Sequence, residues 1–134
     1  MNSIRFVPTV VHGISDYVGA AFLIASPFIF RFSSMGGIAV ILPIVLGAGL
    51  FLYSLLTNYE LGIPAWRVIP MPVHLTVDFV ASAFLALAPF LFGYSNEGVN
   101  VWLPQVIAGV AVMLLVLVSQ TQQQSEVKVV KAAA

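Results

Sequence analysis

The chain has 134 residues, of which 60% are hydrophobic and 7% are charged, and its formal net charge is zero. Soluble domains carry about 25% charged residues, so the composition excludes a soluble globule and indicates a lipid bilayer as the solvent. The neutral balance predicts no nucleic-acid partner, and the lack of Cys excludes disulfides, thiolate metal sites and cysteine nucleophiles.

Four apolar segments are long enough to cross the hydrocarbon core, which takes ~20 helical residues. In chain order they are 9–30, 35–56, 72–92 and 99–118. The links at 31–34 and 93–98 are short. The link at 57–71 carries Tyr59 and Trp66, which are typical of the headgroup level. The sequence therefore predicts an all-α integral membrane four-helix bundle, followed by a polar tail that we expect to be mobile.

The cationic residues predict the orientation of this bundle. Arg5, Arg67, Lys128 and Lys131 fall on the side that holds both termini and the middle link, whereas Arg31 is alone on the other side. Because positive charge is enriched in cytoplasmic loops, both termini are predicted to be cytoplasmic. The same interface places Glu60 near Arg5 and Arg67, where we expect a weak surface ion pair beside Tyr59.

The chain repeats itself at an offset of 62 residues. Between positions 5 and 33, 13 of 29 residues are identical to those 62 positions later, and the pairs include the only two His and the only two Asp. The starts of the second helices align with a one-residue shift. We interpret 1–62 and 63–118 as tandem helical-hairpin repeats and 119–134 as a cytoplasmic tail. Both repeats enter the membrane in the same direction, which predicts a pseudo-twofold axis along the membrane normal.

The duplicated polar residues predict a cluster inside the membrane. His12 and Asp16 are four residues apart, as are His74 and Asp78, so each pair shares a helix face. At 1.5 Å per residue from Pro8, Asp16 lies ~12 Å deep. An ionisable group at that depth must face inward and find a partner. We therefore expect the His–Asp faces of the first and third helices to turn toward each other.

Three interpretations of this cluster stay open at the sequence level. The first is structural: polar bonds fix the register of a small accessory or self-associating bundle, alone or in a larger membrane complex. The second is a proton or ion pathway running from Arg5 and Arg67 through the His–Asp pairs. The third is a haem between His12 and His74, or a divalent metal on the four groups, although no cofactor is required. The chain has no common catalytic motif, which predicts a non-enzymatic protein.

Proline and glycine residues lie where they can end, kink or closely pack the helices. Pro27 and Pro89 lie near the ends of the first and third helices, and they are interpreted as helix-ending or kinking residues. The pairs Gly36–Gly37 and Gly47–Gly49 are interpreted as sites of close helix packing.

The sequence resembles the SPW-repeat family of small bacterial-type membrane proteins, named for a Ser-Pro-Trp motif in the first helix of each repeat. Here the motif reads Ser26-Pro27-Phe28 in one repeat and Ala88-Pro89-Phe90 in the other, so Phe replaces Trp in both. The resemblance implies two transmembrane helices per repeat and a bacterial inner-membrane location. It implies no established biochemical activity.

Overall fold

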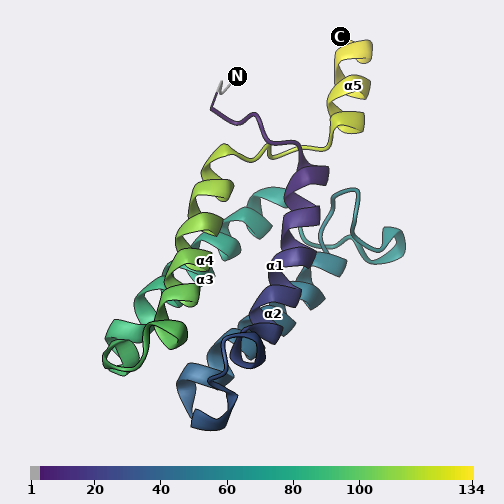
Figure 1. The fold of residues 1–134 in the computed structure, drawn as a ribbon. Coiled ribbons are helices and arrows are strands. Elements are labelled where there is room, and N and C mark those ends of the chain that lie inside the picture. The colour runs from purple at the N-terminus through teal and green to yellow at the C-terminus, as the bar shows by residue number, and fades with distance from the viewer. Residues whose placement is uncertain (1–3) are drawn as a thin grey trace.

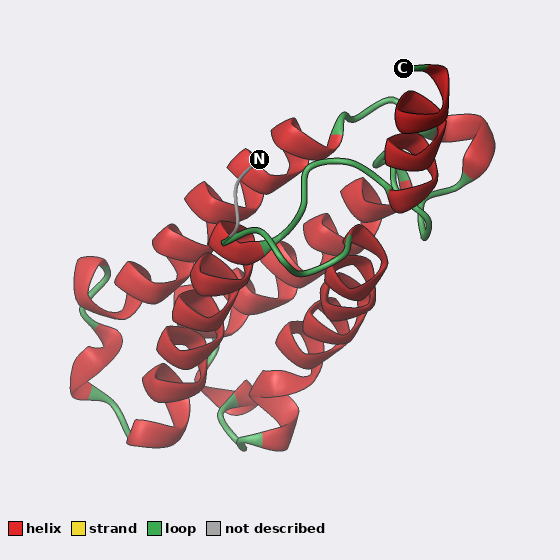
Figure 2. Ribbon diagram, turned by 90° about the horizontal axis from the view of Figure 1, so that it is seen from above, coloured by secondary structure: helices red, strands yellow, loops and turns green. Residues whose placement is uncertain are grey.

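The computed structural model describes residues 4–134 and forms two antiparallel helical hairpins (Figure 1). The long helices are α1 (Thr9–Ile29), α2 (Ile38–Leu55), α3 (Met71–Leu91) and α4 (Val99–Val118). All four are long and apolar enough to cross a membrane. The predicted all-α membrane bundle of two tandem hairpins is therefore confirmed. The loops lie at the ends of the long helices (Figure 2), and both termini lie at one end of the bundle (Figure 1).

The helix ends follow local sequence chemistry. α1 begins after Pro8 and α3 after Pro70, and both prolines have the extended backbone typical of an N-cap position. α2 begins at Ile38, three residues later than predicted. The reason is the pair Gly36 and Gly37, which have φ values of 67° and 68° and so interrupt the helical backbone. This pair is therefore a turn, and its predicted role in helix packing is wrong.

Each hairpin is closely packed, and a glycine permits the approach. A Cβ on Gly47 would lie 2.8 Å from the Ala20 carbonyl oxygen, and one on Gly109 would lie 2.5 Å from that of Ser82. These pairs are related by the offset of 62. Gly49 has nothing within 4 Å of its Cβ position, so only Gly47 has the predicted packing role in α2. Contacts between the hairpins are fewer than contacts within them.

Short elements complete the connections. The 3-10 turns are η1 (Ser33–Met35), η2 (Pro64–Trp66) and η3 (Tyr94–Asn96). The polar tail forms a helix, α5 (Gln124–Ala133), beyond the end of the bundle (Figure 1), which was not predicted from the sequence.

Candidate functional site: a His–Asp cluster between the repeats

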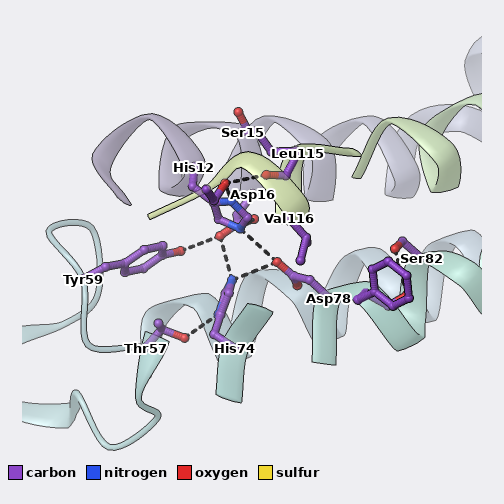
Figure 3. A network of polar contacts seen from close by, with 12 residues as sticks. His12, Ser15, Asp16, Thr57, Tyr59, His74, Asp78, Ser82, Leu115 and Val116 are labelled. Atoms are coloured by element: carbon purple, nitrogen blue, oxygen red, sulfur yellow. Dashed lines mark hydrogen bonds and ion pairs between the residues drawn. The ribbon is translucent and has the colours of Figure 1, made fainter. Parts of the chain in front are cut away.

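The four duplicated polar residues meet between α1 and α3, near the end of the bundle where these two helices begin (Figure 3). His12 Nε2 lies 3.0 Å from the Asp78 carboxylate and 3.3 Å from that of Asp16. His74 Nε2 lies 3.0 Å from the Asp16 carboxylate and 3.1 Å from that of Asp78. Each imidazole thus contacts both carboxylates, one on its own helix and one on the other repeat. We call these residues the His–Asp cluster.

The cluster is buried. Both imidazoles are fully buried, and Asp16 and Asp78 are 4% and 3% exposed. The helical i, i+4 spacing aligns each His with its Asp, and the pseudo-twofold arrangement sets the two pairs against each other. Because the groups lie far from solvent, their arrangement must satisfy them internally.

Two hydroxyl groups orient the imidazoles from outside. The Thr57 hydroxyl lies 2.7 Å from His74 Nδ1 and 2.8 Å from the Tyr53 carbonyl oxygen. The Ser119 hydroxyl lies 2.7 Å from His12 Nδ1 and 2.7 Å from the carbonyl oxygen of Leu115, one turn back in α4. These hydroxyl residues also differ by 62 positions, so the repeat extends to the partners of the cluster.

The hydroxyls determine which imidazole nitrogen carries the proton. A hydroxyl has one proton and a carbonyl can only accept, so Thr57 and Ser119 each donate to a carbonyl. They therefore accept a hydrogen bond from the neighbouring imidazole. His12 and His74 both donate through Nδ1–H, and both present Nε2 to the carboxylates.

The ends of the hairpins hold these hydroxyls in place. The segment after α2 pairs with the segment before α3 through a bridge between Thr57 and Ile69. The segment after α4 pairs with the segment before α1 through a bridge between Val7 and Ser119. The two bridges are again equivalent under the offset of 62. Sequence reasoning missed both hydroxyls, although extending the repeat to the helix ends would have aligned them.

Tyr59 breaks the symmetry of the cluster. Its hydroxyl donates to the Asp16 carboxylate over 2.9 Å, and its side chain is fully buried. Burial raises the pKa of Tyr59, so the phenol stays a protonated donor. A Cβ on Gly13 would lie 2.9 Å from the Tyr59 ring, so this glycine makes room for the aromatic side chain. Tyr59 was predicted as an interfacial residue, and the structure places it on the cluster.

The charged residues predicted at this end make other contacts. Arg5 donates to the carbonyl oxygens of Val116 and Ser119, and Arg67 donates to those of Glu60 and Gly62. The Glu60 carboxylate accepts the Thr9 hydroxyl at 2.7 and 2.9 Å. The expected pairing of Glu60 with an arginine side chain is replaced by these contacts. Arg67 instead donates to the backbone carbonyl oxygen of Glu60, because the 57–71 link folds back on itself.

The Ser-Pro motif has a local structural explanation. Pro27 has no N–H, so the carbonyl of Leu23, four residues earlier, lacks its helical donor. The Ser26 hydroxyl donates to that oxygen over 2.8 Å. Phe28 and Phe90 are 62% and 57% exposed on the outer surface of the bundle. Pro27 and Pro89 are buried near the ends of α1 and α3.

The geometry decides against a haem. A macrocycle between His12 and His74 would have to lie in the plane separating the two Nε2 atoms. Both carboxylates already lie against these nitrogens, at 3.0–3.3 Å, and the imidazole centroids are only 5.6 Å apart. The residues present do not fit a haem, but their nitrogen and oxygen donors are a set that divalent metals use.

Beyond the cluster, two largely apolar cavities lie between the hairpins. A cavity of about 950 Å³ lies between α1 and α4 and reaches Asp16, and one of about 310 Å³ lies between α2 and α3 and reaches Asp78. Leu23, Leu50 and Leu85 line both. Neither cavity presents a chain of ionisable side chains leading away from the cluster.

Comparison with known proteins gives one result. The family model described as the SPW repeat domain matches residues 10–119, which is most of the chain and includes the whole four-helix bundle apart from Thr9. No curated protein and no solved structure matches the sequence.

Proposed function

The chain belongs to the SPW repeat family, and we propose that it acts as a non-enzymatic membrane bundle whose His–Asp cluster locks two hairpin repeats together. It is an integral membrane protein with four apolar helices. The observation that carries the proposal is the exchange of partners between repeats: His12 binds Asp78, and His74 binds Asp16, both at 3.0 Å. A lock of this kind suits an accessory or self-associating protein in a membrane complex.

The distribution of packing supports a lock at this position. Each hairpin has a glycine-mediated interface of its own, whereas the two hairpins share fewer contacts and leave two apolar cavities between them. In lipid, apolar surfaces gain little by leaving the solvent, so polar bonds and close packing decide association. The cluster supplies directional bonds between hairpins that share few other contacts.

A proton or ion pathway has less support. Such a pathway needs polar groups or water on both sides of the cluster. The cavities that reach Asp16 and Asp78 are lined almost wholly by apolar side chains. The cluster is therefore better suited to holding a fixed arrangement than to passing protons across the bilayer.

The placement of the protein in the cell follows the charge pattern. Four of the five Lys and Arg residues belong to the segments at the end that carries both termini. We take this end to be cytoplasmic. The resemblance to small bacterial-type membrane proteins is the support for a bacterial inner membrane. Exposed apolar side chains cover the helices and suit contact with lipid, with a second copy or with another membrane protein.

The test replaces both lock carboxylates by an apolar residue of similar size, Asp16→Leu with Asp78→Leu. Both Nε2 atoms then lose their partners, at a cost of about 1–3 kcal/mol for each buried unsatisfied group. Thermal unfolding in detergent with chelator present should show a lower midpoint. Because the chain has no Cys, spin labels at Val11→Cys and Val73→Cys report the separation of α1 and α3. Their distance distribution should broaden.

The matched control is Ser15→Ala with Thr76→Val. These hydroxyls lie on the same two helices, but each donates to the carbonyl four residues earlier in its own helix. The control should leave the midpoint and the distance distribution unchanged. If the leucine pair behaves like this control, the cluster does not lock the repeats.

A further inference from the structure

We propose that the lock is the binding site of one divalent transition-metal ion, held by His12 Nε2, His74 Nε2 and the carboxylates of Asp16 and Asp78. This inference rests on the proposed lock and names its ligand. The four ligand atoms lie within 4.8 Å of one another, and all four residues are buried.

The proton positions leave the centre of the cluster without a donor. Because Thr57 and Ser119 require the imidazole protons on Nδ1, a neutral imidazole presents only a lone pair from Nε2. The opposing carboxylate oxygens are also acceptors. Four acceptor groups therefore converge, and with both carboxylates ionised they carry a charge of minus two. Either two protons on Nε2 or one divalent cation restores neutrality.

A cation would use all four contacts of the cluster, whereas two protons would use two of them. Four N–O contacts of 3.0–3.3 Å join the two imidazoles to the two carboxylates. With a proton on each Nε2, His12 donates to Asp78 and His74 donates to Asp16, each over 3.0 Å, and the second carboxylate contact of each ring is left without a proton. An ion at the centre contacts all four groups at once.

The four N–O distances suit ligands around one ion, and the widest separation among the ligand atoms, up to 4.8 Å, would have to shorten on binding. Zinc bonds of 2.0–2.2 Å place neighbouring ligand atoms ~3.3–3.6 Å apart in a tetrahedron and ~2.8–3.1 Å apart in an octahedron. The observed N–O separations of 3.0–3.3 Å fall across these two ranges. Two imidazole nitrogens with carboxylate oxygens and no thiolate suit Zn²⁺, Fe²⁺ or Mn²⁺.

The groups around the cluster form the outer layer that metal sites usually have. A metal-bound imidazole commonly donates its second N–H to a fixed acceptor, which sets the ring orientation. Here Thr57 and Ser119 are those acceptors, and each is held in turn by a backbone carbonyl. Tyr59 donates to the Asp16 carboxylate and orients it in the same way. Three of the four ligand side chains are therefore positioned before any ion binds.

Zinc binding to the full chain tests the inference directly. The protein is purified in detergent, stripped with a chelator and titrated with zinc alone against a chromophoric competitor. We expect one zinc ion per chain and the release of about two protons, because the ion replaces those that neutralise the empty site. The buffer dependence of the binding enthalpy measures the proton release. Co²⁺ in place of zinc should give visible absorption bands that report its coordination.

The key variant is Asp16→Asn with Asp78→Asn. It should lose zinc binding and keep the contacts between the two repeats. An asparagine amide can donate to the Nε2 lone pair, so the contacts between repeats survive without extra protons. The amide is a poor ligand, so zinc affinity should fall by more than the ~10–100-fold that outer-layer substitutions cause. The unfolding midpoint in chelator should stay close to that of the unmodified protein.

A second pair of variants tests the outer layer. Thr57→Val removes the acceptor from His74 Nδ1 and should weaken zinc binding by ~10–100-fold. Thr76→Val deletes a hydroxyl that bonds the Pro72 carbonyl within α3, and zinc affinity should not change. Equal effects from the two substitutions would contradict the assigned role of Thr57.

The two proposals fail in different ways. If the unmodified protein binds zinc no more tightly than the asparagine pair, the metal site is overturned, whereas a lower midpoint for the leucine pair in chelator still supports the lock. If zinc binds as expected but the leucine pair is fully stable in chelator, the lock is overturned and the metal site stands.

Discussion

Gln105 in α4 joins the two hairpins at the end opposite the His–Asp cluster, and its replacement by Leu should destabilise the bundle. Its amide donates to the carbonyl oxygens of Ala39 and Val101, each over 3.1 Å, and accepts from Tyr94 over 2.8 Å. Ala39 lies four residues before Pro43, which has no N–H, so its carbonyl lacks the usual helical donor. The other repeat supplies that donor.

The expected cost follows from the groups left without partners. Gln105→Leu leaves the Ala39 carbonyl and the Tyr94 hydroxyl unpaired in a buried environment, because Gln105 is 1% exposed. An unsatisfied buried polar group costs about 1–3 kcal/mol. The free energy of unfolding should therefore fall by about 2–6 kcal/mol, measured by denaturant titration in mixed micelles.

An exposed amide on the same helix provides the control. Asn100 donates to the Phe30 carbonyl over 2.7 Å, also between hairpins, but it is exposed. Asn100→Leu should change the free energy of unfolding by no more than about 0.5 kcal/mol. If Gln105→Leu costs no more than Asn100→Leu, the Ala39 carbonyl does not depend on the amide and the reasoning from Pro43 is wrong.

Two further predictions concern packing and pH. Gly109→Ala should destabilise by about 1–3 kcal/mol, because the new methyl group would lie 2.5 Å from the Ser82 carbonyl oxygen; Gly49→Ala, which meets nothing within 4 Å, should be neutral or mildly stabilising in the same unfolding assay. Burial raises the pKa of Tyr94 from 10.0 to about 12, so the native state keeps this proton at a pH where the unfolded chain loses it. Stability should therefore hold below pH 10 and decline between pH 10 and 12. Tyr94→Phe should flatten this decline in unfolding midpoints measured across the range, and an equally steep decline in the variant would assign it to other groups.

The fold was predictable because the membrane restricts the choices. Long apolar segments between charges define spanning helices, and α4 begins and ends where the sequence predicts. The exceptions are backbone effects. Gly36 and Gly37 delay the start of α2 through positive φ values, which the apolar pattern does not reveal. The helix α5 lies outside the membrane pattern and was missed for that reason.

The site was predictable only in part. The i, i+4 spacing and the repeat were enough to bring His12, Asp16, His74 and Asp78 onto facing helices. The hydroxyls of Thr57 and Ser119 lie after the ends of α2 and α4, and nothing about an isolated Thr or Ser marks it as a partner of a distant imidazole.

Two other contacts depend on spatial proximity alone. Tyr59 reaches Asp16 because the 57–71 link folds back over the bundle. Gln105 matters because Pro43 in the other repeat leaves a carbonyl free. Both relations join residues of different segments through backbone geometry, which hydropathy and periodicity do not encode.

The duplication of the hairpin explains how the His–Asp cluster forms. Each imidazole is held at both nitrogens by the other repeat or its end: His74 by Thr57 and Asp16, His12 by Ser119 and Asp78. One hairpin alone would contain an imidazole, a carboxylate and a hydroxyl. Its hydroxyl, however, bonds the imidazole of the other repeat and would have no imidazole partner. The shared centre therefore forms only when both repeats fold against each other, which lets a few buried polar groups join two hairpins that otherwise share little contact.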